Sequence, residues 1–115
     1  MSTNTTIVGN ITQNPELRFT NSGLAVCNFS VAVNSGKDEK KKTSYFDVVT
    51  FEQLAEDVAE SLSQGLRVIV TGRLQQSSWE DQEGNKRSKV EVVADEVGPS
   101  LRWATCTVSK VERES

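Results

Sequence analysis

One stretch, residues 66–94, restricts the folds open to this chain more than any other. One parity of its first half is apolar or small: Leu66, Val68, Val70, Gly72 and Leu74. Alternation with a period of two is typical of a strand that buries one face. A polar, Gly-centred turn at 81–85 follows, and a second strand returns through residues 90–92. The stretch therefore predicts a long antiparallel hairpin whose tip is too polar to be core.

The opposite parity of the hairpin carries a different set of side chains: Arg67, Thr71, Arg73, Gln75, Ser77 and Trp79. Guanidinium groups and an indole interleaved on a sheet provide phosphate contacts and a stacking surface, which is what single-stranded nucleic acid needs. We therefore expect this outer face of the hairpin to be a nucleic-acid interface.

Composition excludes some classes of function but does not identify one. The 115 residues suit one domain. Thirteen basic and sixteen acidic residues give a net charge of −3, so any polyanion site depends on local clustering of charge. There is no histidine, and the two cysteines lie far apart. We expect no metal site, no cofactor and no catalytic constellation, so the protein is predicted not to be an enzyme.

The N-terminal residues 1–6 contain neither a basic stretch nor an apolar one. No segment approaches the roughly 18 apolar residues of a membrane span. We therefore expect no membrane association and a cytoplasmic location.

The remaining elements follow from periodicity and turn residues. Extended segments are predicted at residues 5–11, 17–19, 24–33 and 43–51, and one more strand at 101–111. Residues 53–63 change to helical spacing, with an apolar stripe of Leu54, Ala55, Val58, Ala59 and Leu62. The order of three main strands, one helix and a hairpin favours an all-β fold with one helix, a five-stranded Greek-key barrel of the OB type, with the extra C-terminal strand added to it.

Eight short motifs then stand in a characteristic order and spacing: VGNI at 8–11, NPELRFT at 14–20 with Gly23, FSVAVN at 29–34, VVTF at 48–51, LAE at 54–56, GRL at 72–74, WED at 79–81 with Gly84, and VEVVAD at 90–95. Over about residues 5–97 the chain thereby resembles the bacterial single-stranded DNA-binding proteins. The resemblance implies an OB fold, a homotetramer and sequence-tolerant wrapping of single-stranded DNA in replication, recombination and repair, in association with the nucleoid.

The resemblance also implies roles for particular side chains. Bases are expected to stack on Tyr45, Phe51 and Trp79, although many members carry Trp where Tyr45 stands. A further aromatic that many members carry in the loop after the second strand corresponds to Lys37 or a neighbour. The family usually ends in a long tail with an acidic tip that recruits replication and repair proteins. Such partners are therefore expected only if a tail exists outside this chain.

The phosphates of the nucleic-acid backbone are expected to contact exposed basic side chains. The candidates are Arg18, Arg73, Lys86, Arg87 and Lys89, supplemented by an arm of Lys37, Lys40, Lys41 and Lys42. Ordinary solvation of a charged surface is the alternative for each of them, and for the arm as a whole.

Residues 1–97 are predicted to form the OB domain, and residues 98–115 to supply the extra strand. The run 95–105 resembles that of a subset of the family in which this strand clamps a neighbouring subunit. The predicted oligomer interface comprises Ile7, Trp103, Ala104, Cys106 and Val108. Buried thiols are the default for Cys27 and Cys106 in a reducing compartment, but an interchain disulfide involving Cys106 is also considered.

Two other functions remain open from the sequence. An OB-type protein-interaction module would suit the acidic net charge. An RNA-binding module is compatible with the same residues, because nothing in them indicates how a 2′-hydroxyl would be treated.

Overall fold

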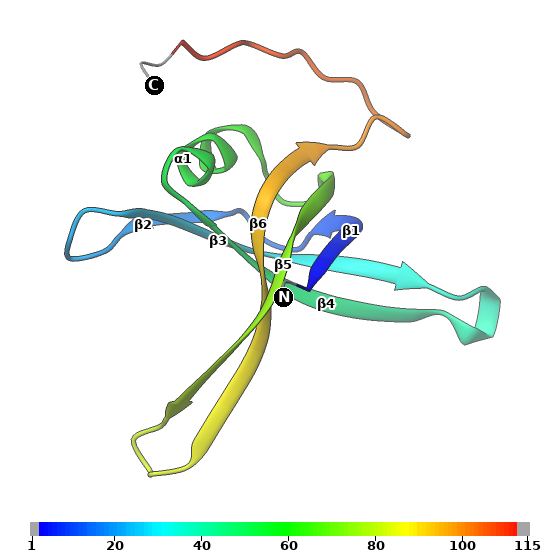
Figure 1. Ribbon diagram of the computed structural model, residues 1–115. Helices are drawn as coiled ribbons and strands as arrows, with labels where there is room; N and C mark the ends of the chain where they lie inside the picture. The colour runs from blue at the N-terminus through cyan, green and yellow to red at the C-terminus, as the bar shows by residue number, and fades with distance from the viewer. Residues whose placement is uncertain (1–2, 113–115) are drawn as a thin grey trace.

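The computed structural model describes residues 3–112 and consists of six strands, one α-helix and one turn of 3-10 helix. The elements are β1 (Asn4–Ile11), β2 (Glu16–Phe19), β3 (Ala25–Ser35), β4 (Lys42–Phe51), α1 (Glu52–Ser61), β5 (Arg67–Glu80) and β6 (Lys86–Pro99). The expected strands at 5–11, 17–19, 24–33 and 43–51, the helix and the long hairpin are all present, with ends displaced by one to a few residues (Figure 1).

The sheet closes on itself. Its strand order is β1-β5-β6-β4-β3-β2, and an additional pairing between β1 and β3 completes a ring of five strands, with β2 attached outside it. The ring contains one parallel pair, β4 with β6, where Val48 lies opposite Val92. This is the predicted OB-type barrel with one helix.

The barrel interior follows the period-two pattern of the strands. Cys27 and Val31 from β3, Val48 from β4 and Val68 and Val70 from β5 are all completely buried. Helix α1 adds Ala55, Val58 and Leu62, the predicted apolar stripe, to the same core. In Figure 1 the helix lies at one end of the barrel, and the β5–β6 hairpin projects from the other end.

The hairpin leaves the barrel at a β-bulge. Thr71 lies opposite Glu96, but Gly72 lies opposite Ala94, so Asp95 has no partner on β5. An extra residue increases the local twist and bends the ribbon. Just beyond the bulge Val92 is still completely buried, but Leu74 opposite it, predicted on the buried side, is 39% exposed.

The predicted strand at 101–111 is not a strand of this chain. Strand β6 ends at Pro99, and residues 101–112 have no regular secondary structure. The segment pairs with no described strand of its own chain, and it does not join the outer edge of β2. The segment instead passes over α1 (Figure 1), leaving a hollow of about 370 Å³ lined by Val58 and Leu62 on one side and Leu101 and Cys106 on the other.

Candidate nucleic-acid interface

The register of the strands defines one continuous face on the outside of the barrel, which we call the outer sheet face. Residues directly opposite each other on neighbouring strands project to the same side of a sheet. Three rows of opposed residues run across it: Asn28–Val49–Val93–Arg73, Ser30–Asp47–Glu91–Gln75 and, on the projecting hairpin, Arg87–Trp79. The face therefore continues from the barrel wall onto the projecting ribbon.

The three aromatics expected to stack bases all belong to this face. Tyr45 is 68% exposed, Phe51 41% and Trp79 47%, whereas Phe29 on the inward parity of β3 is only 6% exposed. Phe51 ends β4, and Glu52 follows immediately with a left-handed φ of 59° as the first residue of α1. Because the chain passes from strand to helix without a loop, the backbone carrying Phe51 is held on both sides.

A small apolar floor lies between these aromatics. Val26, Val49 and Val93 form a cluster with less than a tenth of each side chain exposed, and Leu24 packs against it. These valines point away from the barrel interior, so neighbouring side chains on the outer sheet face must cover them. The face is thus a packed surface rather than a simply solvated one.

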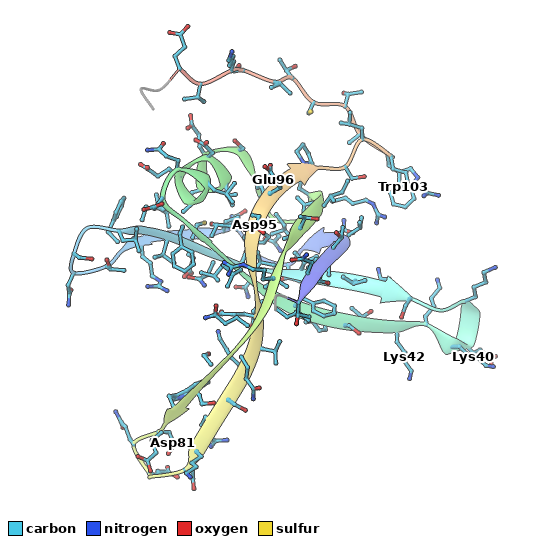
Figure 2. All side chains as sticks on the ribbon, in the orientation of Figure 1. Lys40, Lys42, Asp81, Asp95, Glu96 and Trp103 are labelled. Atoms are coloured by element: carbon cyan, nitrogen blue, oxygen red, sulfur yellow. The ribbon has the colours of Figure 1, made fainter. Side chains whose placement is uncertain are left out.

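The predicted basic residues occupy three places in the fold. Arg18, Arg73, Arg87 and Lys89 belong to the outer sheet face or its rim. Lys86 lies opposite Glu80 on the other parity of the ribbon, but it lines one hollow with Trp79 and Arg87, so its contact with DNA stays a prediction. The lysine arm, Lys37 and Lys40–Lys42, is exposed at the far end of the β3–β4 hairpin, where Figure 2 shows Lys40 and Lys42.

Several of these cations already have partners. The Nη2 of Arg18 donates to Asn28 Oδ1 at 3.2 Å. Lys89 Nζ lies 3.6 Å from Glu91 Oε2 and 4.0 Å from Asp47 Oδ2. Exposed ion pairs contribute little free energy, so a phosphate can take over these groups at small cost.

Asp81 organises the hairpin tip (Figure 2). Its Oδ1 accepts hydrogen bonds from the backbone N–H groups of Asn85 and Glu83, at 2.9 and 3.0 Å. Its Oδ2 accepts one from Arg87 Nε at 2.9 Å. The backbone N–H of Asn85 and then the Arg87 guanidinium lower the pKa of Asp81 below its ordinary value of 3.8. The carboxylate therefore fixes both the turn and the guanidinium that lies opposite Trp79.

Acid should loosen this tip. Because the folded pKa of Asp81 is depressed, its contribution to tip stability is complete above the ordinary pKa and is lost as pH falls through the folded one. We expect hydrogen-exchange protection of the Asn85 amide to drop as pH falls below about 4, after correction for the intrinsic exchange rate. In Asp81→Asn the same amide should lack this pH dependence. Equal acid sensitivity in both proteins would contradict the assignment.

The residues expected at the oligomer interface do not share one position. Trp103, Ala104, Cys106 and Val108 are exposed on the C-terminal segment. Ile7, however, is only 9% exposed and belongs to the barrel core, so its side chain has little surface to offer a partner. Ile7 shares its parity with Gly9 and Ile11, which are also buried, so the alternation along β1 could have indicated this position.

The two cysteines differ in access. Cys27 is completely buried in the core, and burial raises the pKa of its thiol. Cys106 is exposed and free. Because a disulfide requires Cα atoms within about 7 Å, and Cys27 is enclosed by the barrel, a disulfide that includes Cys27 is inconsistent with this fold. A link between two copies of Cys106 stays a prediction.

Sequence reasoning missed two features. Asp47 shares parity with Tyr45, so the sequence already placed an acidic side chain on the same face of the sheet. No role was predicted for it. The Arg67 guanidinium lies 4.6 Å from the centre of the Trp103 ring and that of Arg102 lies 5.2 Å from it, and no sequence pattern indicates these contacts. The labelled Trp103 in Figure 2 lies away from the β5–β6 tip, near the start of β5.

No group of three or more potential metal-binding residues occurs between residues 3 and 112. Over the same range, no helix has both the length and the apolar character needed to cross a bilayer.

A closed OB-type barrel whose outer face displays aromatic and basic side chains defines a class of oligonucleotide-binding proteins. Comparison with known proteins narrows the class. The model of the single-strand binding protein family matches residues 2–100, and the chain belongs to that family.

Similar curated proteins carry the same designation. The chain is 52% identical to the single-stranded DNA-binding protein of Mycobacterium leprae, over 96% of this chain and 70% of that protein. It is 51% identical to that of Mycolicibacterium smegmatis, over 96% and 72%, and 43% identical to that of Paenarthrobacter aurescens, over 98% and 70%. The resemblance inferred from the eight motifs is confirmed.

Proposed function

We propose that this protein binds single-stranded DNA on the outer sheet face, without strong dependence on sequence, in replication, recombination and repair. One observation carries the proposal. Tyr45, Phe51 and Trp79 are exposed on one continuous face of the sheet, together with exposed Arg73. Large aromatics in strands are ordinarily packed, so a set of three exposed on one face is a binding surface rather than a core.

The chemistry of binding follows from the polymer. Every nucleobase has a π-face, so an exposed ring accepts any of them, at about 1–3 kcal/mol per stack. Arginine and lysine between the rings neutralise phosphates and release counterions. The overall charge of −3 disfavours a non-specific polyanion surface, which makes the local basic groups of this face decisive.

Titration with oligo-dT, oligo-rU and a DNA duplex of equal length tests the proposal. Oligo-dT should bind most tightly, because duplex bases are already stacked and cannot reach the rings. Equal affinity for oligo-rU would indicate an RNA module, and failure to bind any of the three would favour a protein-interaction module.

Arg73 should act through charge alone. Arg73→Ala is expected to weaken binding to all sequences alike and to flatten the log–log salt dependence by about 0.7 for each phosphate that is no longer neutralised. Lys110→Ala is the matched control, since it removes one exposed positive charge from the C-terminal segment, outside the outer sheet face. Affinity for oligo-dT is measured from low to high salt. An equal change of slope in both variants would exclude a localised phosphate contact at Arg73.

We further propose a homotetramer, in which residues 98–115 clamp a neighbouring subunit. Two features support it. The segment 101–112 is exposed along its whole length and has no strand partner within its own chain. Its exposed Leu101, Trp103 and Val108 provide apolar surface for another copy. Sedimentation equilibrium at micromolar concentration should therefore show a four-chain species, and truncation after Pro99 should weaken it. A single-chain species in the intact protein would refute the assembly.

A cytoplasmic, nucleoid-associated location accompanies this function. Replication and repair proteins are proposed as partners only where an acidic tail is present beyond this chain.

A further inference from the structure

A polar hollow of about 560 Å³ opens on the outer sheet face at Asp47. Its lining comes from the loop before β2 and from strands β2, β3, β4 and β6, and it includes Arg18, Asn28, Ser30, Asp47 and Lys89. Its volume is within the usual range of small-molecule pockets. Two of the predicted phosphate contacts, Arg18 and Lys89, line this hollow, but no role has been assigned to Asp47.

The charges in the hollow are unusual for a surface that binds a polyanion. Asp47 lies near the middle of the face, with its side chain 56% exposed. Asp47 and Glu91 lie opposite each other and share the single ammonium of Lys89, at 4.0 and 3.6 Å. One ammonium cannot saturate two carboxylates, so Asp47 retains hydrogen-bond acceptor capacity. The Asp47 carboxylate can therefore accept a hydrogen bond from a group that donates one.

The position of Asp47 relates it to a stacked base. Tyr45 and Asp47 are two residues apart on β4 and share the outer face, so their Cα atoms are about 6.6 Å apart along the strand. A base whose face lies on the Tyr45 ring can thus direct its edge towards the hollow. The exocyclic amine of cytosine donates hydrogen bonds, and a carboxylate is its natural acceptor. Thymine presents a carbonyl oxygen at the same place.

We propose that Asp47 and Lys89 read the edge of one nucleobase stacked on Tyr45, and that they favour cytosine over thymine. The Asp47 carboxylate accepts from the cytosine N4 amine, while the Lys89 ammonium donates to the neighbouring ring nitrogen. This reading rests on the proposed function and adds a modest base preference to otherwise sequence-tolerant binding. Asp47 and Lys89 are then specificity-determining residues.

The test compares the affinities of oligo-dC and oligo-dT of equal length at neutral pH in the wild type, Asp47→Asn and Asp47→Ala. Base reading predicts that the ratio of the two affinities shifts towards oligo-dT by about fivefold in both variants, the equivalent of removing one edge hydrogen bond. If Asp47 only repels phosphates, both oligomers gain affinity by the same factor and the ratio stays constant.

Two controls separate the possible failures. Glu56→Gln, on the exposed side of α1, removes one negative charge far from the hollow and should leave the ratio unchanged. Thermal unfolding of each variant checks that the fold is intact. If neither oligomer binds the wild type, the proposed function itself fails. If both bind and the ratio is the same in the wild type and both Asp47 variants, only the base-reading inference is overturned.

Discussion

Replacement of Trp79 by alanine is expected to weaken the binding of oligo-dT by about 1–3 kcal/mol for each stack that is removed. The indole is 47% exposed on the outer sheet face, and it is held opposite Arg87, whose guanidinium is fixed by Asp81. A ring positioned in this way loses little conformational freedom when a base stacks on it. Tyr45→Ala should have an effect of similar size, since Tyr45 is more exposed still.

Fluorescence provides an independent readout, because oligo-dT should quench an indole on which a base stacks. Trp103 also emits, since it is 73% exposed on the C-terminal segment, so the quench is to be measured in Trp103→Phe. Two results together would refute the stacking role: binding of oligo-dT by Trp103→Phe with unchanged emission, and wild-type affinity in Trp79→Ala.

The substitution Gly72→Ala should lower the free energy of unfolding by about 3 kcal/mol, near the upper end of overpacking effects. A Cβ at this position would collide with the carbonyl oxygen of Val93 and would lie 2.8 Å from the Cα of Ala94. Both obstacles are backbone atoms of the paired strand, so no side-chain rotation can relieve them. Gly72 is also where the register shifts and the hairpin leaves the barrel, so the strain would reach the ribbon that carries Trp79.

Gly98→Ala is the matched control, because a Cβ built on that glycine meets no atom within 4 Å. Urea unfolding of both variants at one fixed protein concentration measures the difference, since association makes apparent stability concentration-dependent. Similar destabilisation by both substitutions would contradict the close contact with β6 as the reason that position 72 requires glycine.

Parity is a local property and predicted which residues share a face, whereas the stacking roles of Tyr45 and Phe51 were implied by the family resemblance. The alternation in 43–51 alone places Tyr45, Asp47 and Phe51 on the face opposite to Val48, and the same rule separates Trp79 from the core positions of β5. Lys86 shows that the charge of a residue does not reveal on which side of a hairpin it lies. Its basic charge suggested a phosphate contact, but the register of β5 against β6 turns it towards Glu80. A register is a property of two strands, and charge in one of them does not reveal it.

The sequence by itself indicated the helix, most of the strands and the two sides of each, because hydrophobic periodicity depends on residues that are close together in the chain. The strand predicted at 101–111 was wrong. Only the tertiary structure decided which faces join. The parallel pairing of β4 with β6 brings Asp47 beside Glu91 and Lys89, and residues 101–112 join no strand of this chain. These outcomes depend on contacts between residues far apart in the chain. No local pattern contains that information.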